Sequence, residues 1–215
     1  MPEEPTGTDT RGTQVKVVIA TVLLVVVVAV VIVALTDGGG TATPDLAQQQ
    51  PVEVVGDPLI PFSGDTMSDA AIGTVAPVIA GASFDGSSVR IGPGAPTLVV
   101  FLAHWCPHCQ EEVPTLVDWA EGLRVPFGLE VYGVATATTP DRPNYPPSAW
   151  LERERFPFPV LADDAAGTAA AALGTTGFPH LVMLAPSGEV MWRYSGRTPD
   201  GVLEVLVSES MAALG

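Results

Sequence analysis

A long apolar run from 17 to 36 carries no charged side chain. As a helix it would span roughly 30 Å, close to the hydrocarbon thickness of a bilayer. A cleavable signal peptide usually has a shorter apolar core of about 7–15 residues and a small-x-small cleavage site, which residues 35–39 match poorly. The chain has no cysteine before Cys106, which excludes a lipoprotein anchor. The pattern predicts an uncleaved transmembrane helix, with a removed signal peptide as the alternative.

Basic residues lie on only one side of this run. Arg11 and Lys16 precede it, and none follows it closely. Because cytoplasmic flanks carry the excess of Lys and Arg, we expect residues 1–16 to be a cytoplasmic tail and the chain after the run to be extracytoplasmic. Residues 37–66 are rich in Gly, Thr, Pro and Gln and lack apolar periodicity, which predicts a flexible linker. The sequence thus predicts a single-pass protein of the cell membrane with an exported domain over 67–215.

In this domain, runs typical of buried strands alternate with helical spacings. The run at 97–103 is apolar on both faces, as expected inside a sheet, and the helical spacing that follows it contains Pro114, which predicts a kink. Two pairs of short apolar runs flank turn residues and predict β-hairpins. The predicted strands are 78–84, 89–91, 97–103, 129–135, 159–161, 181–184 and 190–194, and the predicted helices are 111–123, a short one around Trp150, 165–173 and 202–214. This order predicts an α/β fold with a central mixed sheet flanked by helices.

The composition agrees with one anchored domain. The chain is 47% hydrophobic and only 15% charged, against roughly 25% charged residues in an average soluble protein. Much of the apolar excess lies in 17–36. The formal net charge of −15 argues against nucleic-acid binding, which needs clustered Lys and Arg. With 2 cysteines in the chain, a disulfide-rich scaffold is excluded.

The two cysteines stand three positions apart, at the predicted junction between the strand 97–103 and the next helix. This is the setting of a redox-active pair. Cys106 would lie at the helix N-terminus, where free amides and the helix dipole favour a thiolate, and His108 would add a positive charge nearby. Cys109, one turn further along, would be the buried resolving thiol. The spacing therefore predicts thiol–disulfide exchange.

Other interpretations of the cysteines remain open. A structural disulfide would close a loop too short to stabilise the fold much, and a structural zinc site would need two more ligands. Copper binding is a stronger candidate, because His104, His108 and His180 lie near the cysteines or in a segment expected to approach them. A copper-binding metallochaperone is therefore the alternative function, and an extracellular binding domain with a vestigial disulfide is a third.

The chain resembles the thioredoxin superfamily over 72–214, and within it the membrane-anchored TlpA-like (ResA-like) thiol-disulfide oxidoreductases. The resemblance is carried by Ala76-Pro77 before the first hairpin, the segment FLAHWCPHCQEEVP around the cysteines, residues 158–174, the segment TTGFPHLVMLAPSGEV and Gly196. It implies a thioredoxin-like fold with an N-terminal β-hairpin and a mid-domain insertion over 136–158.

The resemblance also assigns roles to single residues. Pro179 would be a cis proline against the disulfide, Trp105 would cover the site, and Glu112 would tune proton transfer. The chain has Val100 where thioredoxins carry a buried aspartate. This departure leaves Glu112 as the candidate proton acceptor, although a solvated helix carboxylate is the simpler interpretation of that residue.

These observations predict a thiol-disulfide oxidoreductase that exchanges disulfides with exported proteins and needs no cofactor. The expected partners are exported thiol or disulfide proteins, a membrane redox partner that recycles the cysteine pair, and the lipid bilayer through the N-terminal helix, but no nucleic acid. The direction of exchange is open at this point. The resemblance favours reduction, whereas the Pro107-His108 dipeptide between the cysteines is typical of DsbA-like oxidants and favours oxidation.

Overall fold

The computed structural model describes residues 46–215. The predicted cytoplasmic tail, the predicted membrane helix over 17–36 and the first part of the predicted linker lie outside the described residues, so these assignments stay predictions. Within 46–215, no helix has both the length and the apolar character needed to cross a bilayer.

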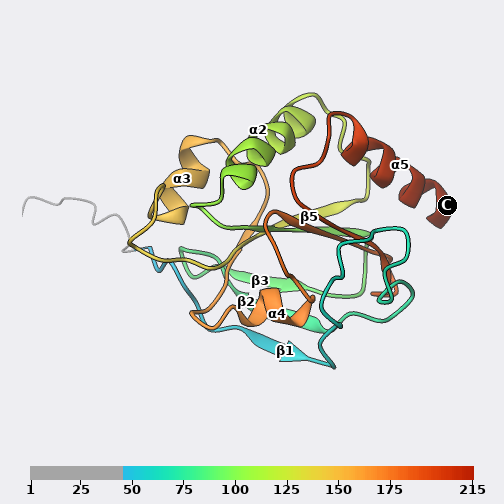
Figure 1. The fold of residues 1–215 in the computed structure, drawn as a ribbon, viewed down its shortest axis with the longest axis horizontal. Helices are drawn as coiled ribbons and strands as arrows, with labels where there is room; N and C mark the ends of the chain where they lie inside the picture. The colour runs from blue at the N-terminus through green and yellow to red at the C-terminus, as the bar shows by residue number, and fades with distance from the viewer. Residues whose placement is uncertain (1–45) are drawn as a thin grey trace, which may run out of the picture. The chain divides into compact units, whose positions relative to one another are not determined.

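A five-stranded mixed sheet forms the centre of the described domain (Figure 1). Its strands, in spatial order, are β6 (Val160–Ala162), β5 (Glu130–Ala135), β4 (Thr97–Leu102), β7 (His180–Leu184) and β8 (Val190–Ser195). β4 pairs in parallel with β5 and β5 with β6, whereas β7 runs antiparallel to both β4 and β8. The expected α/β fold with a central mixed sheet is confirmed.

β4 supplies side chains to both faces of the sheet, because successive residues of a strand point to opposite sides. Leu98, Val100 and Leu102 pack in one apolar core, and Val99 and Phe101 pack in the other. All of β4 is buried as a result. Because both faces of β4 are buried, its sequence does not alternate between polar and apolar residues.

Helices cover one face of the central sheet, and a second sheet covers the other. Figure 1 shows α2, α3 and α5 on one side, and α4 with the strands β1 to β3 on the opposite side. The helices are α2 (Pro107–Glu121), α3 (Pro147–Arg153), α4 (Thr168–Ala172) and α5 (Val202–Leu214). α2 begins four residues before the predicted helix, since Pro107 occupies its first turn, where a missing N–H costs nothing. α3 lies in the expected insertion, between β5 and β6.

The second sheet has one strand more than the sequence predicts. β2 (Val78–Ala82) and β3 (Ser88–Ile91) form the expected hairpin, and β1 (Glu53–Val55) pairs antiparallel with the other edge of β2. The expectation of a flexible linker up to residue 66 differs from the structure here. β1 belongs to an arm over 46–66 that packs against the domain, although its sequence carries no periodic apolar pattern.

Isolated contacts fix this arm. The backbone amide of Leu59 donates to the Ala172 carbonyl and that of Phe62 to the Gly174 carbonyl, each at 2.9 Å, and both apolar side chains are buried. A β-carbon on Gly174, whose φ is +70°, would lie 2.3 Å from the Ile60 carbonyl oxygen. Only glycine therefore allows the arm to approach so closely.

A buried ion pair ties the chain that follows the arm to β8. Arg193 is fully buried, and its guanidinium binds both carboxylate oxygens of Asp69 at 2.6 and 2.7 Å. It also donates to the carbonyls of Ile60 and Leu173. The single side chain of Arg193 thus connects β8 of the central sheet to the N-terminal segment and to the end of α4.

Candidate active site

The two cysteines occupy the first turn of α2, as the sequence predicts. Cys106 is the N-cap residue of the helix, with an extended backbone, and Cys109 follows inside the helix. The backbone amides of Cys109 and Gln110 both donate to the Cys106 carbonyl at 3.1 Å. Both cysteines are free thiols, so the structure describes the reduced form. Cys106 retains 7% exposure and Cys109 none, so only Cys106 can meet an incoming disulfide.

The segment before β7 brings a proline beside this pair. The Phe178–Pro179 bond is cis, which confirms the expected geometry of Pro179. The thiol of Cys106 donates to the Phe178 carbonyl oxygen, with the sulfur 3.3 Å away. The backbone next to Pro179 thus contacts the Cys106 thiol directly, although the two residues are 72 positions apart in the sequence.

The Cys109 thiol is held in its protonated form by its surroundings. Burial is the largest cause that raises the pKa of Cys109, far above its ordinary range. A hydrogen bond with the Ala103 backbone opposes this rise, and negative charge on Cys106 or Glu112 adds to it. Since the thiolate is the attacking species in disulfide exchange, Cys109 needs a proton acceptor before it can react.

Glu112 follows Cys109 by one turn of α2, and its charge is among the causes that raise the pKa of the Cys109 thiol. The Glu112 side chain is fully buried and accepts hydrogen bonds from the Thr198 amide at 2.8 Å and the Thr198 hydroxyl at 2.6 Å. Burial raises the pKa of Glu112, and the bonds from Thr198 and the charge of Arg197 oppose the rise. The interpretation of Glu112 as a solvated helix carboxylate is therefore wrong. Thr198 was not predicted, because it is 86 positions away along the chain.

We predict that Glu112→Gln slows the attack of Cys109 on a mixed disulfide by about a hundredfold, since positioned acid–base groups contribute at least that much. Stopped-flow measurement of mixed-disulfide resolution would check this. Glu111→Gln is the matched control, because Glu111 is its neighbour on α2 and its side chain is 58% exposed. Equal resolution rates in both variants would contradict the role of Glu112.

The same substitution has a predictable effect on stability. Because the folded protein raises the pKa of Glu112 above its unfolded value, the contribution of this carboxyl to stability is fully present below the unfolded pKa and is lost as pH rises through the folded pKa. Glu112→Gln removes the titration. The variant should therefore gain melting temperature over the wild type at neutral pH and lose that advantage in acid.

Trp105 lies between two side chains on the rim of the site. Its indole N–H donates to the Ala137 carbonyl at 2.9 Å. Its ring meets Phe178 edge to face at 6.2 Å, and the guanidinium of Arg142 lies 5.4 Å from the ring centroid. The residue is half-buried, and its covering of the cysteines stays a prediction.

The histidines do not gather around the cysteines as a copper site would require. His108 is 65% exposed, and its Nδ1 lies 3.6 Å from the carboxylate of Glu111. This carboxylate would offset a positive charge on the His108 ring. His180 is buried in the opposite core, between Phe62 and Phe101, and burial lowers its pKa to about 4. Within 46–215, no three His, Cys, Asp or Glu side chains are grouped to hold a metal.

His104 is also engaged elsewhere. The sequence interpretation of His104 as a possible copper ligand differs from the structure, in which His104 is 1% exposed. Both ring nitrogens have protein partners, the Pro143 carbonyl at 2.6 Å from Nδ1 and the Thr139 amide at 3.3 Å from Nε2. Both ring nitrogens of His104 are therefore engaged in hydrogen bonds, and neither is free to coordinate a metal.

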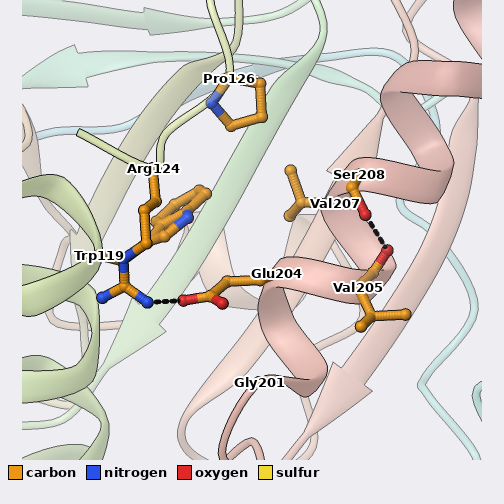
Figure 2. A pocket seen from close by; sticks show the side chains of 8 residues that line it. All are labelled: Trp119, Arg124, Pro126, Gly201, Glu204, Val205, Val207 and Ser208. Atoms are coloured by element: carbon orange, nitrogen blue, oxygen red, sulfur yellow. Dashed lines mark hydrogen bonds and ion pairs between the residues drawn. The ribbon is translucent and has the colours of Figure 1, made fainter. Parts of the chain in front are cut away.

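A separate pocket of about 540 Å³ lies between the C-terminal end of α2 and α5. Figure 2 shows Arg124 and Glu204 paired across it, with Trp119 behind them. This end of α2 is about 20 Å from Cys106, given the rise of 1.5 Å per residue. The pocket contains no thiol, so the redox chemistry belongs to the other end of the helix.

Comparisons with known proteins agree with this geometry. The sequence model of the AhpC/TSA family matches residues 69–193. A thiol:disulfide interchange protein DsbE homolog from Paracoccus denitrificans is 32% identical over 137 residues, which cover 61% of this chain and 70% of that protein. The thiol:disulfide interchange protein HelX from Rhodobacter capsulatus is 26% identical over 152 residues, covering 69% and 81% of the two chains.

A solved structure shares the fold. The thiol:disulfide interchange protein of the thioredoxin family from Chlorobium tepidum is 25% identical, with a TM-score of 0.53, and the match covers 69% of this chain and all of that one. The cysteine pair at the start of α2, the cis proline beside it and these similarities agree on one class. The chain belongs to the AhpC/TSA family and is a thiol-disulfide oxidoreductase with a thioredoxin-like fold.

Proposed function

We propose that this protein is an extracytoplasmic reductase of disulfides in exported proteins. The observation that carries the proposal is the order along α2 of Cys106, which retains a small exposed area, the fully buried Cys109 and the fully buried Glu112. The Cys106 thiolate attacks one sulfur of a substrate disulfide. A mixed disulfide forms, and the other substrate sulfur leaves as a thiolate that takes up a proton.

The second step resolves the mixed disulfide. Cys109 gives its proton to Glu112, and its sulfur attacks the sulfur of Cys106. The substrate leaves with its second cysteine as a thiol. Two electrons have then passed to the substrate, and the enzyme carries the Cys106–Cys109 disulfide, which a membrane redox partner would reduce again.

Reduction is the direction that the Cys109 environment supports. A strong oxidant needs a stabilised reduced form, which is achieved by stabilising thiolates. Burial raises the pKa of Cys109, so this thiol stays protonated and contributes no stabilised thiolate to the reduced form. An oxidant would use a positive charge on His108 to stabilise the Cys106 thiolate. Here the carboxylate of Glu111 lies 3.6 Å from His108 Nδ1 and offsets such a charge. We therefore favour reduction over the oxidation that the Pro107-His108 dipeptide suggests.

The cellular setting is supported by sequence features outside the described residues. The apolar run at 17–36 and the basic residues before it favour a membrane anchor with the redox domain outside the cytoplasm. Exported proteins with reducible disulfides are then the accessible substrates.

Trapping in the native membrane would test this proposal. In the full chain, Cys109→Ser should accumulate mixed disulfides between Cys106 and exported proteins, since the second step is blocked. The double variant Cys106→Ser, Cys109→Ser is the control and should capture nothing. If Cys109→Ser captured no partner, and the wild type took up Cu(I) stoichiometrically through its thiols without exchange activity, the copper-binding alternative would replace this proposal.

A further inference from the structure

The loop over 137–145, here called the site loop, is bonded to the residues just before Cys106. Trp105 donates to the Ala137 carbonyl at 2.9 Å, and the Asn144 side-chain amide donates to the His104 carbonyl at 3.2 Å. The His104 ring lies between two more of these loop residues, donating from Nδ1 to the Pro143 carbonyl and accepting at Nε2 from the Thr139 amide. The site loop is thus held at both of its ends.

The partners of His104 determine its protonation. A carbonyl oxygen only accepts, so Nδ1 must carry the proton, and a backbone amide only donates, so Nε2 must offer its lone pair. Both bonds can form together only on the neutral ring. Since the side chain is 1% exposed, water cannot readily replace either partner.

The site loop carries side chains suited to contact a polypeptide. Arg142 stacks over Trp105, and among residues 46–215 no carboxylate lies within salt-bridge distance of its guanidinium. Tyr145 is 45% exposed, and its ring meets the His104 ring at 5.9 Å. Arg142 thus places a cation over Trp105, and Tyr145 places an exposed aromatic ring against His104, the residue before Trp105.

We propose that His104 is a positioning residue that holds the site loop beside Trp105, and that the site loop on one side and Phe178 and Pro179 on the other form a groove for the substrate polypeptide. This inference rests on the proposed function, since it names what holds the substrate at Cys106. His104 touches neither reacting sulfur through its ring. It acts through the loop that it fixes.

Two disulfide substrates separate groove binding from chemistry. Insulin presents a polypeptide, whereas hydroxyethyl disulfide has no backbone to fit a groove. In His104→Ala, kcat/KM for insulin should fall about tenfold, the effect of losing hydrogen bonds at a buried position, while the rate with hydroxyethyl disulfide stays unchanged. His104→Asn, which keeps a donor for Pro143, should recover part of the insulin activity.

If His104→Ala does not fold, His104→Asn carries the test. It should show the same selective loss of kcat/KM for insulin to a smaller extent, again with an unchanged rate for hydroxyethyl disulfide.

The results with the two substrates distinguish a failure of this inference from a failure of the proposed function. Equal losses with both substrates would overturn the role of His104 while leaving the exchange reaction intact. A wild type without any Cys106-dependent reduction of insulin would instead overturn the proposed function.

Discussion

Cys106→Ser is expected to lower the rate of insulin reduction by at least about a thousandfold, because the serine hydroxyl cannot replace a thiolate nucleophile at neutral pH. Cys106 is the only one of the two thiols with any exposed surface, and it lies at the start of α2, where backbone amides are free. Loss of the first attack stops the whole cycle. Insulin reduction by equal concentrations of folded wild type and variant measures the effect.

Cys109→Ser should fail differently, and the difference is diagnostic. This variant keeps the first attack and should form one mixed disulfide per molecule, followed by no further turnover. The asymmetry follows from burial, since Cys109 has no exposed surface and can react only with a partner already bound to Cys106. If Cys106→Ser kept wild-type turnover, Cys106 would not be the nucleophile.

Asp69→Asn is expected to destabilise the domain by about 3–5 kcal/mol, the usual cost of leaving a buried charge without its partner. Arg193 is fully buried and binds both oxygens of Asp69. In a domain of this size the loss corresponds to a fall in melting temperature of roughly 10 °C. Thermal unfolding followed by circular dichroism measures it.

The pH dependence of the same pair provides a second check. The hydrogen bonds from Arg193 hold the pKa of Asp69 below its ordinary value. This carboxylate therefore contributes stability above its unfolded pKa, and the contribution is lost as pH falls through the folded pKa. The difference between wild type and Asp69→Asn should shrink in acid. Asp57→Asn is the control, because Asp57 is an exposed residue of the N-terminal arm, and equal melting of both variants would contradict the role of the pair.

The sequence predicts the parts of this molecule that depend on local pattern. The two-sided apolar run at β4, the turn residues of the hairpins and the helical spacing of α2 each follow from neighbours in the chain, and the structure has these elements near the predicted bounds. The cysteine pair was found in the same way. Its position at the start of a helix follows directly from a buried strand that leads into it.

The contacts that complete the site are distant along the chain and left no local signal. Glu112 meets Thr198 across 86 positions, and His104 meets Pro143 across 39. A polar residue has the same neighbours in the sequence whether its side chain faces water or forms a buried hydrogen bond. The arm over 46–66 was missed for the same reason, since Leu59 and Phe62 are its buried apolar side chains and backbone hydrogen bonds to distant segments supply the other attachments.

The reduction potential of the Cys106–Cys109 pair tests the central claim most directly. The wild-type domain would be equilibrated with glutathione buffers of known poise, and the fraction of disulfide would be read by alkylation and mass spectrometry. A buried Cys109 thiol whose thiolate is not stabilised predicts a potential near that of a reductant, about −270 mV. A value near about −120 mV, that of a strong oxidant, would contradict the proposed direction.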